Sequence, residues 1–136
     1  MSRENVEIVR GIYEAVARRD AVTPFTYYAE DIVWDISNSR RTTLQESSVY
    51  HGHEGVRQNW REALSVFGEV DLDVEELIDC GGRVVAVICE RETGRTSGAA
   101  VEPSHVAVWT LTDGKVVRMQ MFDDRDQALK AAGLED

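Results

Sequence analysis

Apolar residues recur at helical spacing near the start of the chain, which predicts two helices. The first begins at Ser2, a good capping residue, and ends at Asp20. Its apolar face consists of Val6, Val9, Tyr13 and Val16. A short second helix begins at Thr23-Pro24, because proline fits the first turn of a helix, and runs through Tyr28.

The spacing then changes from strand to helix and back to strand. Ile32, Trp34 and Ile36 alternate as a strand, and a polar loop covers residues 37–48. A third helix starts at Gly52 to Gly55, and its apolar stripe consists of Val56, Trp60, Ala63, Leu64 and Phe67.

The second half of the chain alternates as four antiparallel strands, near residues 72–78, 84–89, 105–111 and 115–122. Tight turns at Gly81-Gly82 and Asp113-Gly114 join them in pairs. Residues 92–103 form a bulged or looped connection. A short last helix covers residues 126–132 and ends at Gly133, a residue suited to a helix C-terminus. The class is α+β.

Composition narrows the possible partners. The chain has 136 residues, of which 43% are hydrophobic, so we expect one domain over residues 1–136. Its net charge of −10 argues against nucleic acid or an anionic membrane as partner.

No apolar run reaches the roughly 20 residues of a membrane span, and no signal-peptide core precedes the first helix, so a cytoplasmic location is expected. Cys80 and Cys89 are too far apart along their hairpin for a disulfide.

Counting from the Asp113-Gly114 turn places Val106 opposite Met121 and His105 opposite Phe122. The first pair shares its face with Met119 and Asp123, and a β-bulge would reverse this assignment. Both faces of the sheet carry large apolar residues, whereas three helices cover only one face. We therefore expect a homodimer through the outer sheet face, the alternative being scattered apolar groups in water.

The order and spacing of these segments resemble the nuclear transport factor two-like superfamily, in its SnoaL-like polyketide cyclase branch. The resemblance runs from about Val6 to Leu134 through IVRGIYEAVARRD, YYAEDIVWD, YHGHEGVRQNW and SHVAVWTLTDGKVVRMQMFDDRDQALKAAGL. It implies a cone-shaped, strongly curved antiparallel sheet that wraps around the three helices of the N-terminal half and leaves an apolar pocket open at one end. No cofactor is implied.

The same resemblance allows the known catalytic positions to be compared. In ketosteroid isomerase the base and the protonated acid match Ile36 and Val106, and its helix-borne tyrosine matches Ile12, or Tyr13 with a shift of one residue. Neither Ile36 nor Val106 can transfer a proton.

SnoaL-type cyclases and limonene epoxide hydrolase place an aspartate at the position of Met121, and the cyclase histidine matches Ala107, two positions after His105. The resemblance therefore implies the fold of these enzymes, but the matching positions of this chain do not carry their catalytic residues.

Asp123 is the candidate base that remains, because it keeps the alternation of the last strand. Arg91 could pair with it in the pocket and keep it ionised. The alternative is that Asp123 or Asp124 caps the last helix and that Arg91 is a rim charge.

The expected pocket lining consists of Tyr13, Tyr28, Trp34, His53, Trp60, Val106, Met119 and Met121. The stretch His51-Gly52-His53-Glu54 carries side chains that can ligate a metal ion, but no motif places a third ligand, so no metal site is predicted. His53 is expected to be a cap or a pocket-rim group, and His105 an interface residue.

Three functions remain open from sequence. The leading one is a SnoaL-like protein that binds a small, mainly apolar, polycyclic or terpenoid-like molecule in its cone-shaped pocket. The second is a cyclase-, isomerase- or dehydratase-type enzyme that uses Asp123 as base, with Arg91, Tyr13 or His53 stabilising developing charge. The third is a dimeric scaffold without ligand.

Overall fold

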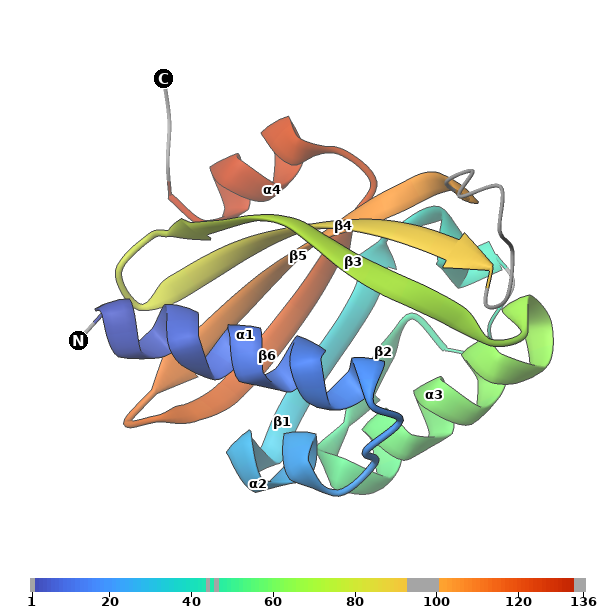
Figure 1. Ribbon diagram of the computed structural model, residues 1–136, viewed down its shortest axis with the longest axis horizontal. Helices are drawn as coiled ribbons and strands as arrows, with labels where there is room; N and C mark the ends of the chain where they lie inside the picture. Colours follow the sequence, from blue (N-terminus) through green and yellow to red (C-terminus); the bar gives the residue numbers. More distant parts are fainter. Residues whose placement is uncertain (1, 44, 46, 93–100, 134–136) are drawn as a thin grey trace.

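The computed structural model describes residues 2–43, 45, 47–92 and 101–133. The helices are α1 (Ser2–Ala17), α2 (Thr23–Tyr27), the short 3-10 helix η1 (Arg40–Thr43), α3 (Gly52–Phe67) and α4 (Arg125–Ala131). The strands are β1 (Tyr28–Asn38), β2 (Val49–His51), β3 (Val70–Asp79), β4 (Arg83–Glu92), β5 (Val101–Thr112) and β6 (Lys115–Phe122). The predicted α+β class is confirmed (Figure 1).

The elements differ from the sequence prediction at three places. Tyr28 begins β1 instead of ending the second helix. The 3-10 helix η1, inside the predicted polar loop, and the strand β2, just after it, were not predicted. The strand β5 already begins at Val101, inside the stretch predicted as a connection. Residues 93–100 of that connection lie outside the described residues.

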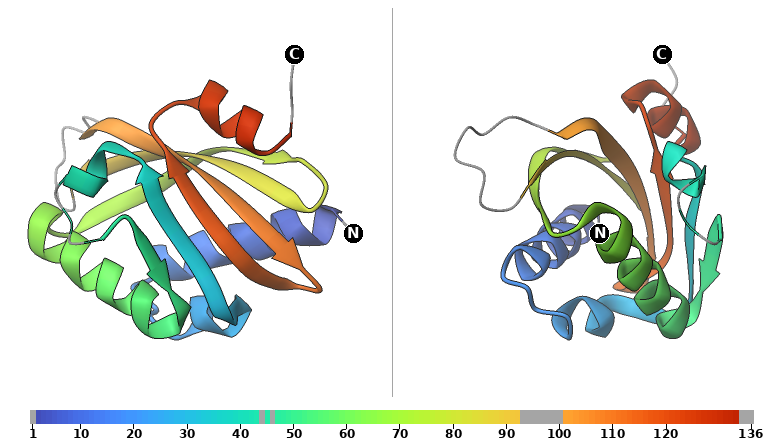
Figure 2. Two further views of the ribbon diagram at one scale, coloured as in Figure 1. Left: turned by 180° about the vertical axis from the view of Figure 1, so that it is seen from behind. Right: turned by 90° about the vertical axis from the view of Figure 1, so that its right-hand side faces the viewer.

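The six strands form one curved sheet in the order β2-β1-β6-β5-β4-β3. All neighbours are antiparallel except β1 and β6, which run parallel and so join the first half of the chain to the last strand. The helices α1, α2 and α3 lie on the concave side, whereas α4 lies on the other side (Figure 2). The main core fills the concave side, where Val9 and Ile12 of α1 and Val56 of α3 are buried against the sheet.

A one-residue bulge in the hairpin of β5 and β6 determines which side chains face the core. Asp113 and Gly114 both have positive φ, 51° and 77°, as the predicted two-residue turn requires. Beyond this turn Leu111 pairs with Val116 as counted, but Thr110 then pairs with Arg118, so one residue of β6 is left over. Every later pair is shifted by one residue.

The shift reverses the face predicted for the far part of β5. Ala107, rather than Val106, lies opposite Met121, and Trp109 lies opposite Met119. His105 therefore shares the concave face with both methionines, and the expectation that it lies on the outer face is corrected. The hairpin therefore contains the β-bulge that was named above as the alternative to the counted register.

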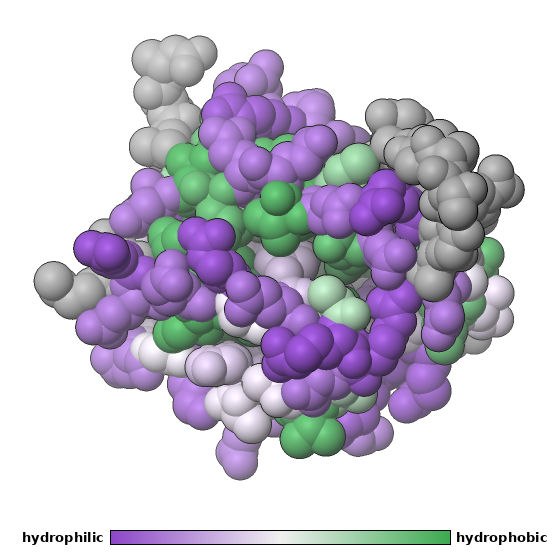
Figure 3. Space-filling view, in the orientation of Figure 1, coloured by the Kyte–Doolittle hydropathy of each residue, from purple (hydrophilic) through white to green (hydrophobic). Residues whose placement is uncertain are grey.

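The outer face has its own apolar cluster, made of Val85, Val106, Val108 and Phe122 with Ala128 and Ala132. The last two residues belong to α4 or follow it, so the fourth helix covers part of the face that was expected to need a second molecule. Apolar side chains appear in patches among charged ones on the face drawn in Figure 3. Within the described residues, no helix is long and apolar enough to cross a membrane.

The helix α4 depends on the cap at its start. The carboxylate of Asp124 accepts a hydrogen bond from the Gln127 amide at 2.8 Å, as the capping alternative for this residue predicts. We predict that Asp124→Ala lowers the free energy of unfolding by about 1 kcal/mol and Tm by roughly 3–5 °C, measured by thermal unfolding.

Asp126→Ala is the matched control for this prediction, because Asp126 is the acidic residue of the first turn, whereas the capping hydrogen bond is made by Asp124. Its loss should cost less than half as much. Equal effects of the two variants would show that the first-turn charge, and not the cap, stabilises α4.

Candidate functional site

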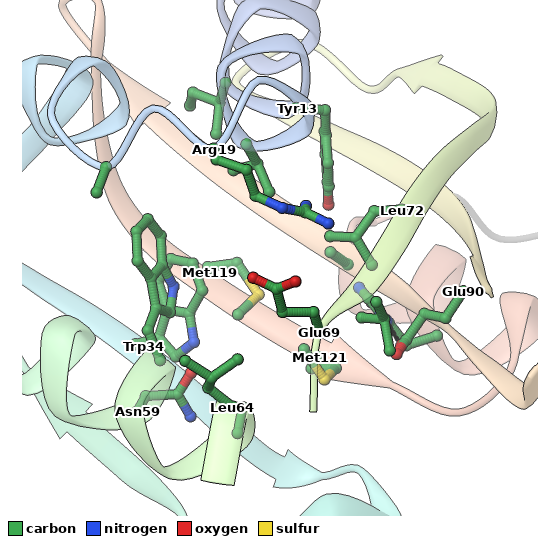
Figure 4. A pocket seen from close by; sticks show the side chains of 18 of the residues that line it. Tyr13, Arg19, Trp34, Asn59, Leu64, Glu69, Leu72, Glu90, Met119 and Met121 are labelled. Carbon is green, nitrogen blue, oxygen red and sulfur yellow. Dashed lines mark hydrogen bonds and ion pairs between the residues drawn. The ribbon is translucent and has the colours of Figure 1, made fainter. Parts of the chain in front are cut away.

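A cavity of about 410 Å³ lies between the concave face of the sheet and the helices α1 and α3 (Figure 4). This volume is within the range of small-molecule sites. Its wall is mainly apolar and includes Trp34, Trp60 and Trp109, which are all the tryptophans of the chain. An aromatic wall of this kind favours a ligand with a flat, apolar body.

The aromatic rings hold one another at fixed angles. Trp34 packs edge to face on Trp109, with ring centroids 5.7 Å apart at 84°, and Tyr13 packs on the same tryptophan at 5.7 Å and 83°. Tyr28 lies 5.7 Å from Trp34 and stacks on Trp109 at 6.3 Å. Four elements thus contribute to a rigid wall, because α1, β1 and β5 carry these rings and α3 adds Trp60.

The cavity contains one buried acid and base pair, His105 and Glu90. Nδ1 of His105 lies 2.6 Å from Oε2 of Glu90, and the side chains are 8% and 4% exposed. They come from neighbouring strands, where Ile88 pairs with His105 just before the irregularity that precedes Glu90. Because a carboxylate only accepts hydrogen bonds, we assign the proton to Nδ1, which leaves Nε2 as the nitrogen available to a ligand.

Tyr13 supplies a neutral hydroxyl to the same cavity. Nε1 of Trp109 donates a hydrogen bond to its oxygen at 3.1 Å. Burial raises the pKa of Tyr13 far above its usual value of 10, which outweighs the lowering by Trp109, and the charge of Glu90 adds to the rise. The hydroxyl keeps its proton and points into the pocket in Figure 4. It is therefore a hydrogen-bond donor held in a fixed position.

Charged groups surround the mouth of the cavity, where Arg19 and Glu69 reach over the opening in Figure 4. Nη2 of Arg19 lies 3.1 Å from Oδ1 of Asp71, and both side chains are partly exposed. Asp20 accepts hydrogen bonds from the hydroxyl and amide of Thr23 and from the amide of Val22, which together lower its pKa to about 2. The mouth is polar, whereas the interior is mainly apolar apart from the pair of His105 and Glu90 and the hydroxyl of Tyr13.

Several predicted pocket residues do line this cavity, namely Tyr13, Tyr28, Trp34, Trp60, Met119 and Met121. Their contact with a ligand stays a prediction. His53 is not among the lining residues: its Nε2 lies 3.0 Å from the carbonyl oxygen of Tyr28, and its ring packs on Phe25. It ties the start of α3 to β1.

Val106, also predicted to line the pocket, lies instead in the cluster beneath α4 on the outer face. The bulge in the hairpin of β5 and β6 is the reason, because it turns Val106 away from Met121.

Asp123 and Arg91 are not brought together. The carboxylate of Asp123 accepts the Arg40 amide at 3.2 Å and lies 3.8 Å from Nε of that arginine. Arg91 instead pairs with Asp73 on the neighbouring strand, with Nη2 and Oδ1 3.0 Å apart. Neither residue is in the cavity lining. The proposed pair fails geometrically because the two side chains lie near the ends of different strands and have closer partners.

Sequence reasoning missed Glu90 as a functional residue and placed His105 on the wrong face. Glu90 continues the alternation of Val84, Ala86 and Ile88, which all face the core, so its position in that row was a usable signal. Within the described part of the chain, no three His, Cys, Asp or Glu side chains cluster as a metal site would need.

Comparisons with known proteins agree with this architecture. Residues 9–119 match the family model of the SnoaL-like domain. The chain is similar to TerC, which was co-crystallised with polyporic acid, with 23% identity, a TM-score of 0.75 and coverage of 96% of this chain and 99% of TerC. No curated protein matches the chain.

Two further solved structures are similar. One is an NTF2-like protein of unknown function from Burkholderia pseudomallei, with 25% identity, a TM-score of 0.75 and coverage of 96% of this chain and 98% of that one. The other is a putative SnoaL-like polyketide cyclase from Mesorhizobium loti, with 22% identity, a TM-score of 0.60 and coverage of 85% and 96%. The likeness supports the fold.

The raised pKa of Tyr13 has a consequence for stability at high pH. Above pH 10 the unfolded chain releases the tyrosine proton, whereas the folded chain retains it, so the free energy of unfolding falls as pH rises. One such group contributes up to about 1.4 kcal/mol per pH unit. We predict that Tyr13→Phe makes this decline shallower between pH 10 and 12, measured by urea unfolding.

Tyr27→Phe provides the comparison, because Tyr27 packs against the core but is only partly buried. Identical slopes for wild type and Tyr13→Phe would mean that the Tyr13 hydroxyl is not held in a buried, neutral state.

Proposed function

The chain belongs to the SnoaL-like domain family, and we propose that it binds a small, mainly apolar molecule in the cavity on the concave side of its sheet. The observation that carries this proposal is the cavity of about 410 Å³ whose wall contains every tryptophan of the chain. The related TerC structure with polyporic acid supports a ligand at this kind of fold. A polycyclic or terpenoid-like body suits the wall.

The expected affinity comes from burial of the ligand's apolar surface. Each 100 Å² of apolar surface removed from water contributes roughly 2.5 kcal/mol. Part of this is offset by the lost freedom of the ligand, so a compact ring system should bind better than a flexible chain of the same size. The rigid aromatic wall adds to this preference, because little side-chain freedom is lost there.

Ala107 offers a direct test of binding, because its small side chain lines the cavity and is 1% exposed. We predict that Ala107→Leu fills part of the space and weakens binding of N-phenyl-1-naphthylamine, a neutral fluorescent probe, by about tenfold or more. Fluorescence titration gives the dissociation constant.

Val108→Leu is the matched control, because the next residue of β5 is equally buried but faces the outer cluster. Its binding should equal that of wild type. If Ala107→Leu binds the probe as tightly as wild type does, the proposed site is not where the molecule binds.

A second candidate function is proton-transfer catalysis, and the buried pair of His105 and Glu90 favours it. Nε2 of His105 would take a proton from the bound molecule, and the Glu90 carboxylate would stabilise the imidazolium that forms. The hydroxyl of Tyr13 would donate a hydrogen bond to the oxygen on which negative charge develops. Return of the proton from Nε2 to another atom of the molecule completes an isomerisation. In a dehydration the imidazolium instead gives the proton to the departing hydroxyl group, which leaves as water while the C–H electron pair forms the double bond.

This arrangement differs from the reference enzymes of the superfamily. The positions of their catalytic acids hold Ile36, Val106 and Met121, so the activity of those enzymes is not transferred to this chain by position. The pair of His105 and Glu90 replaces Asp123 as the better candidate, since this pair lines the cavity and Asp123 does not.

Proton abstraction can be tested without the natural substrate. We predict that the protein accelerates exchange of the acidic C–H protons of 2-tetralone in deuterium oxide, followed by NMR. His105→Gln and Glu90→Gln should lower the rate on the order of a hundredfold. Asp123→Asn examines the base suggested by the sequence and should leave exchange intact.

If exchange survives in His105→Gln but is lost in Asp123→Asn, the base is Asp123 and not His105. Exchange no faster than in buffer would leave binding as the function of the cavity.

Assembly remains a prediction. The helix α4 packs on β4, β5 and β6 but covers only part of the outer face. A homodimer would use the part of this face on β1, where Asp35 is buried and its carboxylate accepts a hydrogen bond from Arg118 at 3.1 Å. A cytoplasmic location also stays a prediction, as does the scaffold function if the cavity holds no ligand.

A further inference from the structure

Two hydrogen-bond donors in the wall of the cavity have no partner among the described residues. They are Oη of Tyr28 and Nε1 of Trp34, and both atoms are buried. Buried polar groups of folded proteins are nearly always hydrogen-bonded, so each exception calls for an explanation. Two exceptions in one wall point to a shared cause.

The two donors belong to one local arrangement. Tyr28 and Trp34 both come from β1, their ring centroids are 5.7 Å apart, and both rings pack on Trp109. Tyr28 is 2% exposed and Trp34 is 6% exposed. Burial raises the pKa of Tyr28 well above 10, so its hydroxyl keeps a proton to donate. An indole nitrogen can only donate.

The charges around the cavity restrict what these donors can bind. Three carboxylates line it, those of Asp20, Glu69 and Glu90, against the one guanidinium of Arg19. That guanidinium also pairs with Asp71. The local charge is therefore negative, which disfavours a ligand that is itself an anion.

We propose that Tyr28 and Trp34 form an acceptor subsite that selects an apolar ring compound carrying a neutral oxygen acceptor, such as a ketone or quinone oxygen, over its hydrocarbon or carboxylate counterpart. The inference rests on the proposed binding function and adds the chemical class of the ligand. Figure 4 shows Trp34 and Glu90 on opposite sides of the pocket, so the acceptor oxygen lies at the end away from the acid and base pair.

Access to the two donors requires a side chain to move. Met119 pairs directly with Trp34 across β1 and β6 and lines the same cavity. Its thioether side chain is unbranched and changes rotamer readily, so we expect its displacement to open the way from the cavity to the donors.

Three probes of similar shape test the proposal by isothermal titration calorimetry: 2-acetylnaphthalene, its hydrocarbon counterpart 2-isopropenylnaphthalene, and 2-naphthoate. Wild type should bind the ketone about tenfold more tightly than the hydrocarbon, and the carboxylate least tightly. Tyr28→Phe should weaken binding of the ketone more than binding of the hydrocarbon, and so reduce the ketone preference several-fold. Trp34→Phe should act in the same direction.

A second readout uses stability without any probe. Removing an unpaired buried hydroxyl relieves a cost of folding, so Tyr28→Phe should raise Tm by roughly 2–4 °C. Tyr50→Phe is the matched control, because the Tyr50 hydroxyl is hydrogen-bonded to Glu62 and lies outside the cavity lining. It should lower Tm and leave the probe affinities as in wild type.

The outcomes separate the two proposals. Equal binding of ketone and hydrocarbon, or a ketone preference that survives Tyr28→Phe, overturns the acceptor subsite and leaves the binding function standing. Tightest binding of the carboxylate also overturns it. If none of the three probes binds, the binding function itself fails and the subsite fails with it.

Discussion

The single extra residue in β6 near the turn is the constraint on which the site depends. Because side chains alternate along a strand, a shift of one residue exchanges the two faces of everything beyond it. The bulge lies between the pairs Thr110–Arg118 and Leu111–Val116. It turns His105 and Ala107 inward and Val106 outward, so the same event creates the polar end of the cavity and the outer cluster under α4.

The arrangement is costly for the stability of the fold, which argues that the buried polar groups have a function. Burying an imidazole and a carboxylate together is rarely better for stability than apolar residues of the same size. His105 and Glu90 are nevertheless almost fully buried, and the residues two positions away on the same face, Ala107 and Ile88, belong to the apolar core. Tyr28 and Trp34 add to the same cavity two buried donors that have no partner among the described residues. A core selected only for stability would hold fewer such groups, which is why we interpret the cavity as a binding site.

Much of the fold follows from local patterns in the sequence. The apolar spacing of α1 and α3, the turn at Asp113-Gly114 and the alternation of the last strands all predicted elements that the structure contains. The three-residue strand β2 is too short to leave a periodic signal, and the parallel pairing of β1 with β6 is a long-range contact that no local pattern records. The site was harder to predict because it depends on strand register, which a bulge changes without a mark in the hydrophobic pattern. Asp123 kept its alternation and still lies outside the cavity.

The central claim is that His105 lies in the cavity and meets whatever binds there. The chain has only three histidines, so their ring signals can be followed individually by NMR during titration with N-phenyl-1-naphthylamine. We predict that the His105 ring signals move as the probe binds, while those of the exposed His51 stay in place. Saturable binding of the probe with unchanged His105 signals would contradict it.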